Sequence, residues 1–491
     1  MFRDLRPLLG CLALWLLAIL PALGEDWPGW RGPLRTGAVA NSPPLIDELP
    51  TEGLLPQWVS EPVMAARNGG WASPVIADGK VFLFAHEREQ LQELGKPKYP
   101  YLPDDKRGGM SATDLAEYEK NRRTEEQERS EACAFREHVF AFDAETGETV
   151  WHNRSDSVYS RWPQSGSPTV AGGRLWLLGA GLNFRCLDAN TGEDLWTQRL
   201  PGEFTDEFFQ SSVVLVDNLA IVMATKLFAL NADTGAIVWA GERTAFSGLH
   251  STPAVWQSPS GMRVLVNIGG GQTGCFDCAD GRLVWLARTE GGHSTPIVVG
   301  DRLITYGNSR QKGLRCSHLR ETGAEELWQF HGAQDKGSTP VVVGDYVYVQ
   351  GDRRVACVGL TDGKAAWTGE LDLASPQYTS LVAADNKVFF AYDGLTVFRA
   401  TPDAFEPLFQ AKFNASQLMA TEPQLRAMLK IEEIEQQPNG QVLAMRTWQR
   451  EVNQHGPLKC GTPAMANGRM YLRTNKAVVC YDLRKPVAIA P

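Results

Sequence analysis

The chain has 491 residues, a hydrophobic fraction of 43% and a formal net charge of −9. This hydrophobic content is enough for a large core, and the negative charge without a basic stripe argues against a nucleic-acid partner. Length alone suggests about three domains, but a regular repeat along the chain overrides that expectation, because stacked units share one core.

The N-terminus predicts a secretion signal over residues 1–24. Arg3 and Arg6 form a short positive region, residues 8–20 are apolar, and Ala22-Leu23-Gly24 supplies small residues at the cleavage positions. We therefore expect a secreted mature chain that begins near Glu25, with no transmembrane span after cleavage. The alternative is an uncleaved membrane anchor, although the apolar run is short for a span.

An N-terminal extension over residues 25–53 follows. It is too rich in proline and glycine for a helix or a central strand, and we expect Trp27 and Trp30 to fill a surface groove. The stretch around Trp58 then looks like an isolated strand with no partner upstream.

A turn ending in a tryptophan is the main repeat. Asp143 can bond the backbone ahead of it, Gly147 can adopt the positive φ of a tight turn, and Trp151 falls on the next strand, where its ring can fill the space between two sheets. Successive copies are 39 to 46 residues apart and end at Trp151, Trp196, Trp239, Trp285, Trp328 and Trp367.

Each repeat begins with a second signature, in which a hydroxyl residue, usually followed by proline, opens a short apolar run. The eight starts are Ser73, Ser167, Ser212, Thr252, Thr295, Thr339, Ser380 and Thr462. A turn and a second apolar strand follow, so each unit has four antiparallel strands. We predict an all-β, eight-bladed β-propeller over residues 54–484. In it the strand at Trp58 completes the last blade, and Phe409 replaces the tryptophan of blade seven.

Two polar, helix-prone insertions interrupt the period, at residues 86–137 inside the first blade and at 414–454 between blades seven and eight. Insertions between strands fall on one face of a propeller, so either could form a binding surface; a solvated surface helix is the alternative.

The nine cysteines are expected to be small core residues rather than a disulfide framework. Cys186, Cys275 and Cys480 occupy the repeat position held elsewhere by Ala141 and Ala229, and Cys316 and Cys357 lie near it. The spacing of Cys275 and Cys278 would also suit a redox or metal site, but no second pair accompanies it.

Residues just before the inner strands are candidates for a site at the channel mouth. His250 and His293 occupy equivalent points of neighbouring blades and could contribute to a metal or anion site, or could each bond the backbone of the next blade. The other candidates are Trp71, Gln164, Lys336 and Tyr378, with Arg67, Asn68, Gln210 and Lys459 at the same level. Mixed polarity with aromatic walls is typical of a small-ligand pocket and also of a solvated funnel. No catalytic or metal-binding residue is predicted.

The motif Ala-x-Asp-x-x-Thr-Gly-x-x-x-Trp at Ala141–Trp151 resembles the tryptophan-docking motif of the quinoprotein (PQQ-dependent) alcohol dehydrogenases, and the resemblance covers roughly residues 54–482. The opening Trp27-Pro28-Gly29-Trp30-Arg31-Gly32-Pro33 is similar to that of secreted bacterial PQQ-like repeat proteins, many of which are named after the assembly lipoprotein of the outer-membrane Bam complex.

The resemblance implies a non-enzymatic binding or assembly scaffold at the cell envelope or in the periplasm, with an envelope protein or a small ligand at one propeller face. A PQQ-dependent alcohol or sugar dehydrogenase with calcium is the alternative, and a sugar- or polymer-binding module is a third. The dehydrogenases carry adjacent cysteines against the quinone, whereas this chain has no Cys-Cys pair. The Bam lipoprotein is anchored by a cysteine after its signal, and this chain has none near residue 24. The oligomeric state is left open.

Overall fold

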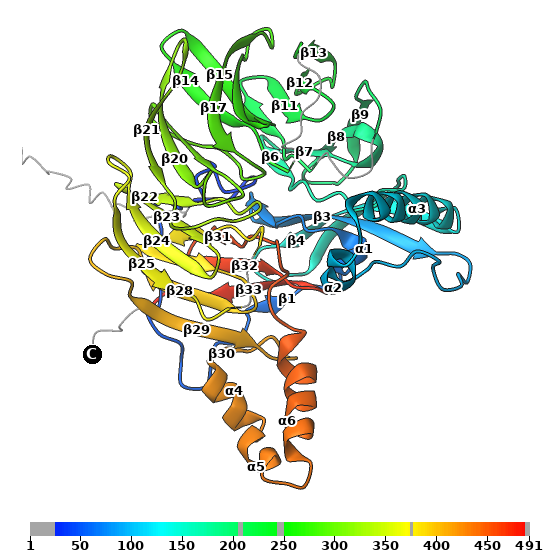
Figure 1. Cartoon of the computed structure of the whole chain (residues 1–491), viewed down its shortest axis with the longest axis vertical. Coiled ribbons are helices and arrows are strands. Elements are labelled where there is room, and N and C mark those ends of the chain that lie inside the picture. The colour runs from blue at the N-terminus through cyan, green and yellow to red at the C-terminus, as the bar shows by residue number, and fades with distance from the viewer. Residues whose placement is uncertain (1–24, 205–209, 243–249, 374–376, 487–491) are drawn as a thin grey trace, which may run out of the picture.

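Eight antiparallel sheets follow one another in chain order and form a ring, as the sequence predicts. The computed structural model describes residues 25–204, 210–242, 250–373 and 377–486, so the predicted signal peptide lies outside the described residues. Figure 1 shows the succession from the blue N-terminal strands through green and yellow to the red C-terminal sheet, which lies next to the blue strands.

Each blade begins with a short inner strand, because the hydroxyl signature opens it and a tight turn ends it. Blades one to four are β2 (Val75–Ala77), β3 (Lys80–Gln90), β4 (Cys133–Asp143) and β5 (Thr149–Asp156); β6 (Thr169–Ala171), β7 (Arg174–Leu178), β8 (Asn183–Asp188) and β9 (Asp194–Arg199); β10 (Val214–Val216), β11 (Leu219–Met223), β12 (Leu227–Asn231) and β13 (Ile237–Ala240); and β14 (Ala254–Ser258), β15 (Gly261–Gly269), β16 (Gly271–Asp277) and β17 (Leu283–Gly291).

The second half of the ring repeats the pattern. Blades five to eight are β18 (Ile297–Val299), β19 (Arg302–Tyr306), β20 (Leu314–Arg320) and β21 (Gly323–Phe330); β22 (Val341–Val343), β23 (Tyr346–Gly351), β24 (Arg354–Gly359) and β25 (Ala365–Glu370); β26 (Val382–Ala384), β27 (Lys387–Phe390), β28 (Leu395–Arg399) and β29 (Pro407–Phe413); and β31 (Ala464–Ala466), β32 (Arg469–Arg473), β33 (Val478–Asp482) and β1 (Trp58–Val59). Blade seven has a fifth strand, β30 (Met419–Ala420), that the prediction did not include.

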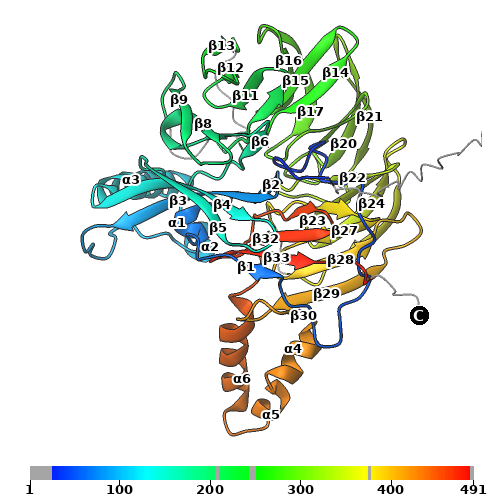
Figure 2. The same cartoon turned by 180° about the vertical axis from the view of Figure 1, so that it is seen from behind.

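The two ends of the chain meet in blade eight, which confirms the predicted closure. β1 pairs antiparallel with β33, with Trp58 opposite Cys480 and Val59 opposite Val479, and the two strands lie side by side in both views (Figures 1 and 2). The rings of Trp58 and Tyr471 are 5.9 Å apart. The closing strand is short, because Leu54 bridges to Met419 of blade seven instead.

The repeated tryptophans join neighbouring blades near the outer strands. Each lies opposite the small residue of the third strand, as Trp151 does opposite Ala141, and its indole N–H donates to a carbonyl of the next blade. The seven bonds, 2.7–3.2 Å long, run from Trp58 to Ala144, Trp151 to Ala189, Trp196 to Ala232, Trp239 to Cys278, Trp285 to Arg320, Trp328 to Leu360 and Trp367 to Thr401. Phe409 takes the position opposite Val397, which confirms its predicted substitution for tryptophan.

The glycine of the turn is required for two reasons. Gly147 has φ +74°, and a Cβ there would come within 2.5 Å of the Trp58 ring. The tryptophan of one blade therefore rests on the glycine of the next, which explains why the two residues recur together.

The hydroxyl signature has a role that the sequence did not reveal. Seven of the eight hydroxyl oxygens accept the backbone N–H of the equivalent residue in the preceding blade, at 2.9–3.2 Å, whereas Thr462 Oγ1 accepts none among the described residues. They run from Ser73 to Ser167, Ser167 to Ser212, Ser212 to Thr252, Thr252 to Thr295, Thr295 to Thr339, Thr339 to Ser380 and Thr462 to Ser73. We call this set the inner hydroxyl ring.

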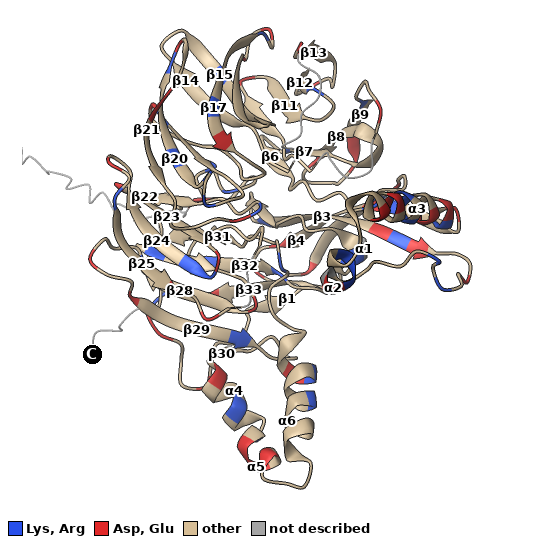
Figure 3. Cartoon of the chain, in the orientation of Figure 1, with Lys and Arg blue, Asp and Glu red and all other residues tan. Residues whose placement is uncertain are grey.

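Both predicted insertions contain helices. In the first, β3 and β4 extend as a long hairpin, so only residues 91–132 lie outside the blade; α2 (Asp104–Gly108) and α3 (Ala112–Ser130) follow there, and α3 carries interspersed charges of both signs (Figure 3). The second holds α4 (Glu422–Met428), α5 (Ile431–Glu435), α6 (Gly440–Trp448) and a π-helical turn at Gln449–Asn453, and it projects from the ring. Two single-turn helices, α1 (Ala66–Gly69) and the 3₁₀ helix η1 (Ala180–Leu182), complete the described elements. No helix in the described part of the chain is long and apolar enough to cross a membrane.

The repeat cysteines are core residues, as expected. All eight cysteines in the described ranges are free, and those of the repeat position, namely Cys186, Cys275, Cys316, Cys357 and Cys480, are fully buried. Burial raises the pKa of Cys275 and of Cys278 to about 12, so both remain thiols at neutral pH.

Candidate functional site

The N-terminal extension runs through the centre of the ring and touches seven of the eight blades. Its contacts, in chain order, are Trp27 with Ile76, Pro28 with Val170, Trp30 with Thr295, Arg31 with Thr339 and Leu381, Arg35 with Val213, Val39 with Ala383 and Ile46 with Leu483. The predicted surface groove for its tryptophans is therefore wrong. Trp27 is buried among blades, and Trp30 faces the channel, because the inner strands offer backbone groups that the extension can bond.

Arg31 anchors this extension in the protein interior. Its guanidinium donates to Thr36 O at 2.7 Å, Leu381 O at 3.1 Å and Thr339 O at 3.4 Å, and also to Pro340 O. Burial lowers its pKa to about 9, so it stays charged at neutral pH. Carbonyl groups at the beginning of two inner strands stabilise this charge. If these two strands separated, the guanidinium would lose its hydrogen-bond acceptors.

Above the extension lies a cavity of about 370 Å³, at the level where the inner strands begin. A cavity of this volume is within the range of small-ligand pockets. Its lining residues are Trp30, Trp71, Trp162, Pro163, Ser165, Ser167, Gln210, Ser212, His250, Thr252, Gly337, Tyr378 and Cys460. Since Trp30 belongs to the extension, the chain's own N-terminal segment closes the cavity on one side.

Aromatic rings form much of the wall. Trp71 and Trp162 make a tilted pair with ring centroids 6.0 Å apart and an interplanar angle of 53°. His250 meets Tyr378 edge to face at 6.3 Å and His293 at 4.7 Å. The cavity therefore offers several ring faces at different inclinations, which suits a flat or ring-shaped ligand.

The two histidines are neutral at physiological pH. Desolvation by the surrounding protein lowers the pKa of His250 to about 4, and the nearby His293 lowers it further by a smaller amount. The side chain nevertheless remains exposed on the cavity side. Burial also lowers the pKa of His293. Its Nδ1 is buried and has no hydrogen-bond partner among the described residues. Of the two predicted roles, a metal site lacks further ligands: no group of three His, Cys, Asp or Glu side chains in the described ranges could hold an ion.

Tyr378 is held toward the cavity by an unusual backbone. Its φ is +62°, a left-handed conformation that is unfavourable for a bulky side chain. The Tyr378 N–H donates to Asp335 Oδ1 at 3.0 Å, and the same oxygen accepts the N–H groups of Gly337 and Ser338 at 2.8 and 2.6 Å. A Cβ at Gly337 would collide with the Tyr378 ring. Asp335 thus fixes the tyrosine through the backbone, and burial raises the pKa of this carboxyl.

The structure brings together only part of the predicted set. Trp71, Gln210, His250 and Tyr378 line the cavity, and His293 packs against His250. Gln164 is buried outside the lining, Lys336 and Arg67 are exposed, Lys459 lies over the Tyr392 ring, and the Asn68 side chain is not described.

The residues that sequence reasoning missed came from two sources. Trp30 and Trp162 lie in segments without a repeat, so no spacing marked them, whereas Cys460 lies two residues before the start Thr462, as His250 does before Thr252, and was overlooked there. Ser167, Ser212 and Thr252 belong to the hydroxyl signature, which was recognised as a strand start but not as part of the lining.

Comparison with known proteins places the chain among PQQ-like propellers. The family model described as outer membrane protein assembly factor BamB matches residues 135–260, 226–401 and 317–486. The quinoprotein alcohol dehydrogenase PedH of Pseudomonas putida is 26% identical over 182 residues, which cover 35% of this chain and 29% of PedH. BamB of Moranella endobia is 27% identical over 235 residues, which cover 42% of this chain and 57% of that protein. The chain thus spans between about a third and somewhat over half of the length of these relatives.

Solved structures share the architecture at low identity. A europium-containing methanol dehydrogenase superimposes with a TM-score of 0.52 at 11% identity, covering 79% of this chain and 85% of that one. The quinohemoprotein alcohol dehydrogenase ADHIIG from Pseudomonas putida HK5 gives 0.53 at 11% identity, covering 95% and 82%. At this identity the likeness concerns the fold alone. Because the three matched stretches together extend from residue 135 to residue 486, this chain belongs to the PQQ-like propeller family described as outer membrane protein assembly factor BamB.

Proposed function

We propose that this protein is a non-enzymatic binding scaffold of the bacterial cell envelope, which takes a small ligand into the cavity at its channel mouth. The observation that carries the proposal is the cavity itself. It is closed on one side by Trp30, walled by aromatic rings and lined by neutral polar groups whose positions the fold already fixes. A preformed aromatic cavity with a few oriented polar groups is typical of a binding site.

The relatives support an envelope location. Two of the curated relatives are named outer membrane protein assembly factor BamB, and the predicted signal peptide would deliver this chain to the same compartment. A protein partner at one propeller face is compatible with ligand binding in the channel, because the two sites need not overlap.

The alternative function, a PQQ-dependent dehydrogenase, requires charged groups that the described lining of the cavity does not contain. Pyrroloquinoline quinone is a tricarboxylate, and the calcium that accompanies it prefers several oxygen ligands with carboxylates among them. Among the described lining residues there is no lysine, arginine, aspartate or glutamate. The described residues therefore do not fit this cofactor.

A reconstitution experiment separates the two functions. Purified protein is incubated with PQQ and Ca²⁺, and dye-linked oxidation of ethanol and of glucose is measured together with the melting temperature. A binding scaffold should give no turnover and no cofactor-dependent rise in melting temperature. Turnover that requires PQQ would overturn the proposal in favour of the dehydrogenase.

A further inference from the structure

We propose that the ligand of the channel cavity is a neutral saccharide, stacked on the tryptophan rings and hydrogen-bonded to hydroxyl groups of blades two to four. This assignment rests on the binding function proposed above and adds the chemical class of the ligand. Three features of the cavity point to it: its lack of charge, its ring faces and its hydroxyl groups.

The described lining offers no charged side chain to a ligand. None of its described residues carries a charge at neutral pH, since the only titratable side chains in it are His250, Tyr378 and Cys460. The imidazole of His250 is neutral at that pH, and burial raises the pKa of Cys460 to about 11. Moving an ion into the cavity costs part of its hydration, and none of the described lining side chains supplies the opposite charge. Lys336 and Lys459 are exposed nearby but do not line it.

Tryptophan faces suit the apolar faces of sugar rings. The aromatic π-face carries partial negative charge and attracts the weakly positive C–H groups that project from a pyranose ring. Trp71 and Trp162 meet at 53° with centroids 6.0 Å apart, so they form a corner that can contact two sides of one ring. Trp30 closes the floor, and its indole N–H is already engaged by Thr295 at 3.2 Å. Its ring face, rather than its donor, is what a ligand would meet.

The inner hydroxyl ring supplies oriented polar groups. Ser167, Ser212 and Thr252 belong both to this ring and to the cavity lining. Each oxygen accepts a backbone N–H of the preceding blade, at 3.0, 2.9 and 3.2 Å. A hydroxyl that accepts one bond can still donate its own hydrogen. Three such donors at fixed positions, together with Gln210, match a ligand that presents many hydroxyl oxygens.

One unsatisfied atom lies behind this wall. Nδ1 of His293 is buried without a partner among the described residues, and its ring packs against His250 at 4.7 Å. A buried polar atom without a partner destabilises the free protein. His293 does not itself line the cavity, so a water held beneath the lining is what could link this atom to a polar ligand.

Calorimetric titration of the full-length mature protein tests the assignment. Glucose, N-acetylglucosamine, maltose and cellobiose serve as neutral probes, and glucuronate and glucosamine as anionic and cationic analogues of similar shape. We expect saturable binding of at least one neutral probe and at least tenfold weaker binding of its charged analogues. In Trp71→Ala that affinity should fall about tenfold, the size expected for one lost aromatic contact. Trp162→Ala provides a second cavity variant if the first fails to fold.

Trp448→Ala is the matched control, because it removes the same side chain from α6, outside the cavity. It should bind the sugar as the parent does. The assignment is overturned if no neutral probe binds at millimolar concentration, if a charged analogue binds as tightly, or if Trp71→Ala and Trp162→Ala leave binding unchanged.

A parallel thermal-shift screen with charged and with aromatic small molecules distinguishes the two levels of the proposal. If such a compound binds and Trp71→Ala abolishes its binding, the binding function stands and the saccharide class is wrong. If no class of compound binds in the cavity, both are wrong.

Discussion

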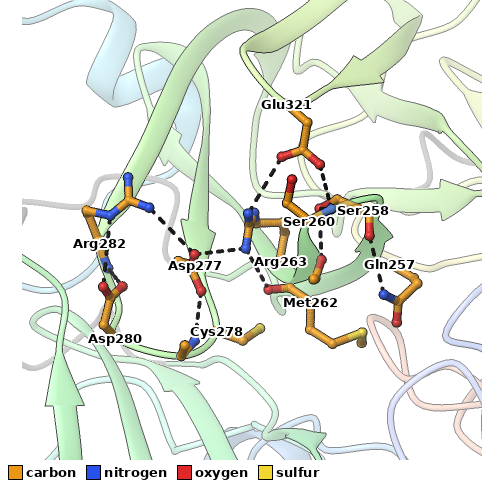
Figure 4. Close-up of polar contacts among 12 residues, drawn as sticks. Gln257, Ser258, Ser260, Met262, Arg263, Asp277, Cys278, Asp280, Arg282 and Glu321 are labelled. Carbon is orange, nitrogen blue, oxygen red and sulfur yellow. Dashed lines mark hydrogen bonds and ion pairs between the residues drawn. The ribbon is translucent and has the colours of Figure 1, made fainter.

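The seam between blades four and five and the seam between blades seven and eight are joined in different ways. At the former, Trp285 Nε1 donates to Arg320 O at 3.1 Å and the N–H of Thr252 donates to Thr295 Oγ1 at 3.2 Å. Arg263 of blade four adds ion pairs, to Asp277 of its own blade at 2.9 Å and to Glu321 of blade five at 3.6 Å (Figure 4). An ordinary seam thus has an outer bond, an inner bond and, here, a charged contact.

The seam between blades seven and eight lacks both recurring bonds. Phe409 occupies the tryptophan position, and its ring has no N–H to donate across the seam. On the inside, the hydroxyl Oγ1 of Thr462 is buried without a partner among the described residues. Cys460 N instead donates to Thr379 Oγ1 at 3.1 Å, in the opposite direction. The two rings of bonds are therefore interrupted at the same place, which is also where the second insertion leaves the propeller.

The N-terminal extension compensates by crossing this seam. Leu45 N donates to Asp385 Oδ2 of blade seven at 2.7 Å, and Ile46 N donates to Leu483 O beside blade eight at 2.8 Å. Asp47 pairs with Lys387 at 3.3 Å and with Lys485 at 2.5 Å. The N-terminal extension therefore closes one side of the cavity and also connects blades seven and eight. Ligand binding and ring closure thus depend on one structural element.

The largest expected effect is at an ordinary outer bond. Trp239→Ala removes an almost fully buried ring that bonds Cys278 O at 2.9 Å, and should lower the free energy of unfolding by about 3–5 kcal/mol. Trp239→Phe converts this seam to the type at blades seven and eight and should cost about 1–3 kcal/mol, because the buried Cys278 carbonyl loses its donor and the smaller ring fills less of the site. Denaturant unfolding measures both. An alanine variant that unfolds like the parent would show that the indole does not join the blades.

A matched pair of substitutions compares the inner bonds. Thr295 Oγ1 accepts N–H groups from Thr252 and from Trp30, so Thr295→Val should destabilise the protein by about 1–3 kcal/mol, because buried donors lose their partner. Thr462→Val removes a buried oxygen that has none and should change stability by less than about 0.5 kcal/mol. Equal losses in the two variants would mean that the two seams do not differ as described.

The smallest effect concerns the charged contacts of the extension. The hydrogen bond from Lys485 and the charge of Lys387 hold the pKa of Asp47 below its usual range, while partial burial acts in the opposite sense. A depressed carboxyl pKa contributes stability above the unfolded value of about 3.9, and this contribution is lost as the pH falls through the lower folded value. Asp47→Asn should therefore cost less than about 1 kcal/mol at pH 7 and nothing once the carboxyl is protonated. A deficit that persists at the lowest pH at which both proteins are folded would argue against an electrostatic role.

The fold was accessible from sequence because its determinants are periodic. The docking tryptophans, the hydroxyl starts and the substitution of Phe409 all follow from spacing, and the closing strand at Trp58 follows from counting an incomplete last blade. The site was accessible in part, because most lining residues are hydroxyl starts or lie two positions before one, whereas Trp30, Trp162 and the direction of each side chain follow from no spacing. Tyr378 and Lys336 both lie just before the start of an inner strand. Tyr378 points inward because Asp335 fixes its backbone, whereas Lys336 is exposed. Trp30 reaches the cavity because the N-terminal extension crosses the ring, and only tertiary contacts determine that course.

Hydrogen exchange followed by mass spectrometry tests the difference between the two seams: because the seam between blades seven and eight lacks both recurring bonds, we expect it to open more easily than the seam between blades four and five, even with the extension across it. In the unmodified protein, the amides of β26 and β31 should exchange faster than those of β14 and β18, which flank the seam between blades four and five. Asp47→Asn should widen this difference. Equal protection on both sides of the ring, or faster exchange at β14 and β18, would contradict the account.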